Sequence, residues 1–139
     1  MTEIGRLIDV SPRDVWADEA RNFTPWLTEH IEELGEVLGL RLEKEDTEVA
    51  VESFSADIVA RSLDDDGLVL IENQLERTDH GHLGQIMIYL AGVGAQVIVW
   101  IATEFREPHL AAIKWLNEHT VEPYAFFAVK LRVVRIGDS

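Results

Sequence analysis

The sequence predicts an α/β fold in which a mixed central sheet is flanked by helices. Apolar residues at helical spacing alternate with short β-branched runs that are typical of strands. Their order is helix, three strands, helix, strand, helix, strand, which indicates a mixed sheet. The chain has 139 residues, 47% of them hydrophobic, enough for one domain with its own core. We expect a single domain, with an N-terminal extension at residues 1–20 and a core at 21–139.

The first half of the chain predicts one helix and three strands. A short strand or turn ends near Pro12. Thr24 and Pro25 favour a helix start, and Gly39 favours its end. The Asp-Asp-Asp-Gly run at 64–67 predicts a turn that joins two strands as a hairpin. The strands are expected at residues 47–52, 54–62 and from 68 onward.

The second half alternates helices and strands. Thr78 or Asp79 can cap the helix that follows the third strand. The expected ranges are a helix at 81–91, a buried strand at 96–102, a helix at 108–119 and a long last strand at 124–136. The histidines His30, His109 and His119 are predicted on helix surfaces. The tryptophans Trp26, Trp100 and Trp115 fit core or half-buried positions, with no stacking platform at any clear spacing.

The net charge of −14, from 12 basic and 26 acidic residues, opposes contact with nucleic acid and anionic membranes. The absence of cysteine excludes disulfides and Cys-ligated zinc. No apolar run reaches about 18 residues, and the first residues lack the layout of a signal peptide. We therefore expect a cytoplasmic protein with no membrane partner.

Two acids stand at unusual places in the predicted strands. Asp57 directly precedes an apolar strand, where Asp is rare. Glu72 follows four apolar residues, and a period of two puts it on one face with Leu68, Leu70 and Gln74. A face that changes from apolar to polar in this way indicates a strand that leaves the core and enters a site.

A hairpin around the Asp-Gly turn would bring Asp57 and Glu72 together. Two adjacent carboxylates repel each other unless a divalent cation lies between them. Hard oxygen ligands favour Mg²⁺ or Mn²⁺. The alternative is that Asp57 caps a local turn and Glu72 pairs with an arginine such as Arg61 or Arg132. These residues alone leave both interpretations open.

The spacing of the acids resembles a known motif. Asp57, fourteen residues and then Glu72-Asn73-Gln74 resemble the active-site motif of the PD-(D/E)XK nuclease superfamily. Gln85 and Tyr89, four residues apart, resemble the Gln-XXX-Tyr element of RecB-type members. Residues 20–139 also resemble the N-terminal half of longer, uncharacterised prokaryotic proteins. The resemblance implies a restriction-endonuclease-like core and a C-terminal domain that this sequence lacks.

The resemblance also implies roles for the motif residues. Asp57, Glu72 and the backbone carbonyl of Asn73 would hold Mg²⁺ or Mn²⁺, with Gln74 as a catalytic residue. An acid from the first helix often completes the metal site. Glu29 is the first candidate and Glu33 the second, although a solvated helix face is at least as plausible for either.

The resemblance also implies roles for residues of the next helix. Gln85 and Tyr89 would position the metal shell or the nucleic-acid backbone, and ordinary core packing is the alternative for Tyr89. His80 and His82 lie near the helix start, where they would contact the phosphate backbone or make local hydrogen bonds.

The implied function is metal-dependent hydrolysis of phosphodiester bonds, with DNA as the expected nucleic acid, in restriction, repair or defence. The family usually has Lys where this chain has Gln74, and a Gln amide supplies no positive charge and takes no proton. The alternative is therefore a catalytically silent nuclease fold that serves in binding or dimerisation, as a homodimer. A third interpretation is an acidic domain with no site.

Overall fold

The computed structural model describes residues 7–16, 22–51 and 54–136. Its centre is a five-stranded sheet with the order β2-β3-β4-β5-β6, which confirms the predicted mixed α/β architecture. β2, β3 and β4 are antiparallel neighbours, whereas β5 and β6 run parallel to β4. The strands span Leu42–Val51 (β2), Phe54–Ser62 (β3), Leu68–Arg77 (β4), Val97–Glu104 (β5) and Ala125–Lys130 (β6).

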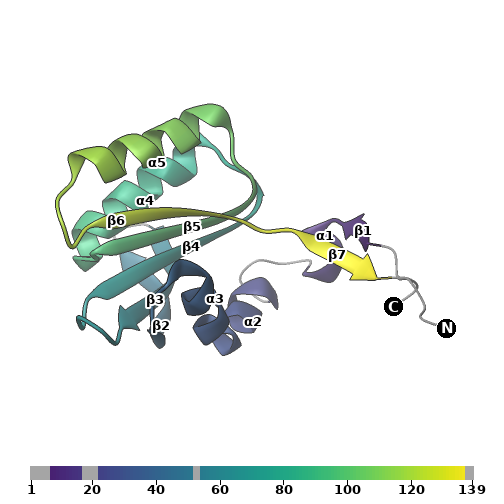
Figure 1. The fold of residues 1–139 in the computed structure, drawn as a ribbon, viewed down its shortest axis with the longest axis horizontal. Coiled ribbons are helices and arrows are strands. Elements are labelled where there is room, and N and C mark those ends of the chain that lie inside the picture. Colours follow the sequence, from purple (N-terminus) through teal and green to yellow (C-terminus); the bar gives the residue numbers. More distant parts are fainter. Residues whose placement is uncertain (1–6, 17–21, 52–53, 137–139) are drawn as a thin grey trace.

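Two pairs of helices cover the two faces of the sheet (Figure 1). α4 and α5 are the crossover connections that parallel strands require, and they lie on one face. α2 and α3 lie on the other face. The helices span Thr24–Glu29 (α2), Ile31–Leu38 (α3), His80–Val93 (α4) and Glu107–His119 (α5).

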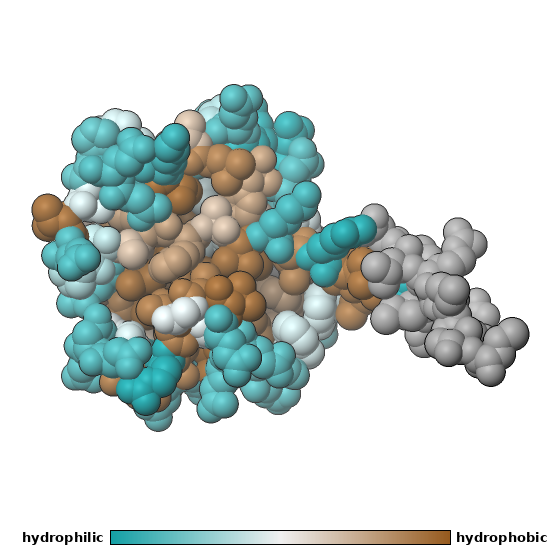
Figure 2. Space-filling model, in the orientation of Figure 1, coloured by the Kyte–Doolittle hydropathy of each residue, from teal (hydrophilic) through white to brown (hydrophobic). Residues whose placement is uncertain are grey.

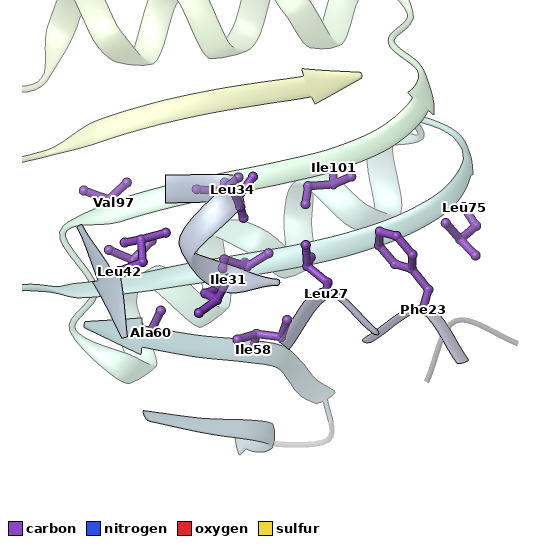
Figure 3. Packing of buried hydrophobic residues seen from close by; sticks show 13 residues of the cluster. Phe23, Leu27, Ile31, Leu34, Leu42, Ile58, Ala60, Leu75, Val97 and Ile101 are labelled. Carbon is purple, nitrogen blue, oxygen red and sulfur yellow. The ribbon is translucent and has the colours of Figure 1, made fainter. Parts of the chain in front are cut away.

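α2 and α3 bury their apolar stripe against the sheet (Figure 3). Leu27, Ile31 and Leu34 point from the helices into one cluster with Ile58 of β3 and Ile101 of β5. Each such side chain contributes about 1.5–3 kcal/mol when it is fully buried. The predicted helical stripe is therefore what attaches these helices to the sheet.

A second core lies under α4 and α5. Ile86 of α4 and Ile113 of α5 pack with Leu70, Ile98 and Trp100 from the strands. Leu70 of β4 belongs to this cluster, and its neighbours Val69 and Ile71 belong to the other. β4 is thus buried on both faces, as its continuous apolar run predicts.

The predicted first helix is two helices. His30 separates α2 from α3, with φ −114° and ψ 23°. Its amide donates to the carbonyl of Leu27, and its imidazole Nδ1 donates to the carbonyl of Trp26 at 2.7 Å. Because the side chain takes the carbonyl that the helix ladder needs, the regular ladder stops there. Gly39 ends α3 as predicted, with φ 74°.

The expectation of one long last strand is wrong. β6 ends at Lys130, and β7 (Val133–Ile136) pairs with β1 (Leu7–Val10), beside the short helix α1 (Pro12–Val15). This two-stranded ribbon projects from the main body (Figure 1). The apolar run continues through both strands, so composition alone does not show the change of partner.

The first of the three consecutive strands is longer than predicted. β2 begins at Leu42 because its pairing with β3 continues to Ser62, across an irregularity between Lys44 and Asp46. Of the N-terminal extension expected at 1–20, residues 1–6 and 17–20 lie outside the described residues. Within the described part of the chain, no helix has the length and apolar character to cross a membrane.

Candidate metal and nucleic-acid site

The β3–β4 hairpin brings Asp57 to the strand that carries Glu72. The last paired residues are Ile58 and Ile71, and one further step in this register places Asp57 opposite Glu72. The Asp57 Oδ2 atom accepts a hydrogen bond of 2.7 Å from the backbone amide of Asn73. Asp57 is half-buried and Glu72 is 4% exposed. The two acids therefore meet where the β3–β4 ladder ends.

The Asp57 side chain takes the place of a strand partner for Asn73. The N–H and C=O groups of one strand residue point to the same side, so the Asn73 carbonyl also faces β3. Carboxylate oxygens and a backbone carbonyl form a hard-oxygen donor set, which fits Mg²⁺ or Mn²⁺ chemically. Among the described residues, no group of three or more His, Asp or Glu side chains is arranged to hold a metal, so the carbonyl is needed for a third protein ligand.

Asn73 also connects the two faces of the sheet. Its side chain lies on the α2 face, where Nδ2 donates to Thr24 Oγ1 at 3.0 Å. Thr24 therefore anchors β4 rather than capping α2, whose N-cap residue is Phe23. This contact fixes the backbone of Asn73 from the side opposite to the acids.

Gln74 is fully buried and its amide is held by three partners. Its Oε1 accepts from the indole Nε1 of Trp100 at 3.0 Å. Its Nε2 donates to the carbonyl of Arg77 at 2.8 Å and to Asp79 Oδ2 at 3.2 Å. Both amide hydrogens are therefore used within the protein, and neither is left to hold a water molecule or a phosphate oxygen.

Asp79 joins Gln74 to the start of α4. Its Oδ1 accepts from the backbone amide of His82 at 2.7 Å and from the imidazole Nδ1 of His82 at 2.8 Å. The expected cap of α4 is thus made by Asp79. Burial opposes its ionisation, but the bonds from His82 and Gln74 outweigh burial, so the pKa of Asp79 lies below its ordinary value.

A second series of hydrogen bonds, through Thr78, His109 and His80, lies beside the series through Gln74 and Asp79. The sequence did not indicate it. His109 was expected on a helix surface, but it is 1% exposed. Its Nδ1 bonds to Thr78 Oγ1 at 2.6 Å and its Nε2 bonds to Nδ1 of His80 at 2.7 Å. The backbone amide of Arg106 also donates to Thr78 Oγ1. These hydrogen bonds connect the end of β4 with α4 and α5. The His80 imidazole bonds to His109, so it points toward the protein rather than toward solvent.

Gln85 and Tyr89 contact each other on α4, where a spacing of four residues puts them on one face of the helix. The Tyr89 hydroxyl donates to Gln85 Oε1 at 3.3 Å. Tyr89 is 2% exposed and belongs to the core under α4 with Ile86. The core-packing interpretation of Tyr89 therefore holds for its ring, while its hydroxyl orients Gln85.

Glu29 and Glu33 lie elsewhere. Both line a hollow of about 550 Å³ with residues from the start of β2, among them Glu43 and Lys44. Leu42 lines the same hollow and pairs with Ser62, at the end of β3 away from Asp57. The structure thus does not bring the acids of the first helix to the β3–β4 site.

Arg61, one of the two arginines considered for Glu72, has other partners. Its guanidinium pairs with Glu45 at 2.8 Å and with Asp66 at 3.1 Å. It also donates to the carbonyl of Asp66, which fixes the turn before β4. Arg61 therefore braces the hairpin away from Asp57.

The tryptophans differ from the expectation in two ways. Trp115 is 58% exposed and stacks on His119, so it is not a core residue. Trp26 is 38% exposed and joins Trp16 and His30 in an aromatic cluster, with ring centroids 5.0 Å and 4.3 Å from that of Trp26. Sequence spacing did not reveal this cluster because Trp16 lies on another element.

Two solved structures share this fold. One is a repair endonuclease from Pyrococcus abyssi, 16% identical with a TM-score of 0.55, and the likeness covers 75% of this chain and 45% of that chain. The other is EndoMS in a complex with double-stranded DNA, 12% identical with a TM-score of 0.53, and the likeness covers 78% and 43%. At these identities the likeness shows a shared fold.

This chain spans less than half the length of either structure. No family model and no curated protein sequence matches it. The likeness therefore supports the mixed α/β fold, and the chemistry has to be argued from the residues of the site.

Proposed function

We propose that the chain is a divalent-metal-dependent nuclease that hydrolyses phosphodiester bonds of DNA. The observation that carries this proposal is the meeting of Asp57 and Glu72 where the β3–β4 ladder ends, with the Asn73 carbonyl facing the same strand. The fold supports it, because a repair endonuclease and EndoMS in a complex with double-stranded DNA share that fold. Of the settings expected from the motif, the first of these structures favours DNA repair.

Asp57, Glu72 and the Asn73 carbonyl would hold Mg²⁺ or Mn²⁺ in this proposal. The bound ion would lower the pKa of a water molecule and offset charge on the scissile phosphate. Glu72 is buried, which strengthens its electrostatic interactions relative to those in water. Asp57 keeps its orientation through the Asn73 amide, and Gln85 is held by Tyr89 on the helix above.

The direct test is cleavage of a labelled double-stranded oligonucleotide by the wild-type chain and by Asp57→Asn and Glu72→Gln. These substitutions keep the shape of each side chain but remove its charge. We expect Mn²⁺-dependent cleavage by the wild-type chain and a loss of at least about 100-fold in each variant, because the charge that holds the cation is gone. Glu118→Gln, on the exposed surface of α5, is the matched control and should cleave at the wild-type rate.

Metal binding is measured in the same samples by calorimetric titration with Mn²⁺. The wild-type chain and Glu118→Gln should bind the ion, and the two site variants should bind it much more weakly. A wild-type chain that neither binds Mn²⁺ nor cuts DNA or RNA would contradict the proposal.

A second candidate is a catalytically silent nuclease fold that binds nucleic acid or a second copy of the chain. The observation that favours it is Gln74, which replaces the usual Lys and whose amide hydrogens are both held by protein atoms. Retention of DNA binding by an inactive wild-type chain and by the Asp57→Asn/Glu72→Gln double variant would support this candidate. Light scattering on the same samples tests the predicted homodimer.

A further inference from the structure

Asp79 and His82 form a carboxylate–imidazole pair beside the proposed site. A carboxylate only accepts hydrogen bonds, so His82 donates from Nδ1 across the 2.8 Å contact with Asp79 Oδ1. The neutral imidazole then carries its free electron pair on Nε2. His82 is half-buried, and none of the described residues bonds its Nε2.

His82 lies on the face of α4 that covers the proposed site on β4. His82, Gln85 and Tyr89 follow one another at spacings of three and four residues, so they share one face of the helix. Tyr89 on that face packs in the same core cluster as Leu70 of β4. Leu70, Glu72 and Gln74 share one face of β4. The helix face with His82, Gln85 and Tyr89 therefore lies over the face of β4 that carries Glu72.

Gln74 connects the Asp79–His82 pair to β4, but it cannot act as a base. The Asp79 carboxylate that orients His82 holds Gln74 Nε2 through its other oxygen, at 3.2 Å. Gln74 itself has no group that accepts a proton at neutral pH. Asp79 contacts Gln74 directly, but both of its oxygens accept hydrogen bonds, so the imidazole of His82 is the next basic group along these bonds.

We propose that His82 is the general base of the reaction and that Asp79 is its positioning residue. The inference rests on the proposed nuclease function. In the step, Nε2 of neutral His82 takes a proton from the attacking water, and the water oxygen forms a bond to phosphorus. The bond from phosphorus to the leaving oxygen breaks, that oxygen takes a proton from solvent, and the imidazolium returns its proton to solvent.

The test compares His82→Ala and His82→Asn with the wild-type chain in the oligonucleotide assay. Both variants should lose about 100-fold or more in kcat, because a positioned base contributes that much, while KM and Mn²⁺ binding stay unchanged. His82→Asn removes the base but keeps an N–H donor for Asp79. It therefore distinguishes the loss of the base from a loss of the hydrogen bonds that cap α4. Added imidazole should restore part of the rate of His82→Ala but none of the rate of Asp57→Asn.

His119→Ala is the matched control, since His119 is an exposed histidine at the far end of α5. It should keep the wild-type rate. Wild-type rates in His82→Asn, or losses in both His82 variants without any imidazole effect, would overturn the inference and leave the proposed function standing. No cleavage by the wild-type chain itself would overturn the proposed function and this inference together.

Discussion

Gln74 stands where the motif usually has a lysine, and its neighbours show how the protein accommodates the change. Trp100 donates to its carbonyl oxygen, and Asp79 and Arg77 accept from its nitrogen. A lysine here would bring its ammonium group to the Asp79 carboxylate, but it would offer no acceptor to the buried indole. The three partners that surround Gln74 therefore include a carboxylate, Asp79, that could pair with the lysine usual in the motif.

Gln74→Lys is expected to raise Mn²⁺-dependent cleavage and to lower stability. The ammonium group supplies the positive charge that the amide lacks, whereas the unpaired Trp100 N–H costs about 1–3 kcal/mol. Initial rates on the oligonucleotide and urea unfolding measure the two effects.

Gln74→Met is the control for Gln74→Lys, since it disturbs the same cage without adding charge. Equal rates in the Lys and Met variants would contradict the role assigned to the charge.

At the scale of elements, Asn117 of α5 covers the outer edge of β6. The backbone amides of Ala125 and Leu131 donate to the carbonyls of Gln96 and Ala102 along β5. Backbone groups alternate in direction along a strand, so the amide and carbonyl of Phe126 point away from β5. The Asn117 Nδ2 donates to the Phe126 carbonyl, and its Oδ1 accepts from the Phe126 amide, both at 2.8 Å. One side chain thus acts as a neighbouring strand would, and it blocks part of an edge that could pair with another chain.

Asn117→Ala should destabilise the fold by about 1–2 kcal/mol, because two backbone groups lose their partners. It should also increase self-association, since the edge of β6 is then open. Urea unfolding measures the first effect, and sedimentation velocity at several concentrations measures the second. Glu118→Ala, one residue further along α5, should change neither quantity. A variant that is destabilised but sediments like the wild type would show that Asn117 does not protect this edge.

His109 is buried where β4, α4 and α5 meet, and its pKa changes when the protein unfolds. Burial, with the charges of His80 and Arg106, lowers the pKa of His109 from its ordinary value of 6.5, and Asp79 opposes the shift. Above pH 6.5 the histidine is neutral in both states. As the pH falls below that value, the unfolded chain binds a proton that the folded chain resists, so the stability decreases.

His109→Gln should therefore flatten the acid side of the stability profile. The wild-type free energy of unfolding should fall by up to about 1.4 kcal/mol per pH unit below pH 6.5 from this one group. Unfolding in urea at several pH values measures the slope. His119→Gln, an exposed histidine on the same helix, should keep the wild-type slope, and an unchanged slope in His109→Gln would contradict the assignment.

At the scale of the whole molecule, charge and apolar surface act in opposite directions. The net charge of −14 repels nucleic acid and a second copy of the chain at long range. The face in Figure 2 nevertheless shows apolar side chains gathered between the two layers of helices. An apolar hollow of about 210 Å³ lies between α2–α3 and the strands β5 and β6, lined by Trp26, Val37, Val129 and Leu131 among others. The predicted homodimer thus has an apolar surface available once the repulsion is screened.

Salt should raise the unfolding temperature of the chain. Excess acidic charge destabilises the compact state, and the screening length falls from about 30 Å at 0.01 M to about 3 Å at 1 M salt. Scanning calorimetry across this range of NaCl measures the change. The Glu32→Gln/Glu36→Gln variant, which removes two exposed charges from α3, should depend less on salt. An equal salt dependence in this variant would contradict the electrostatic explanation.

The sequence by itself determined the order of the central elements, the β3–β4 hairpin and the placement of Asp57 near Glu72. These features depend on local periods and on one turn, and such signals are contained within a few neighbouring residues. The tertiary structure alone decided the partners of Gln74, the burial of His109 and the change of partner after β6. Trp100 lies 26 residues from Gln74, and His109 lies 31 residues from Thr78. Contacts across such separations depend on how the layers pack, so no local pattern could indicate them.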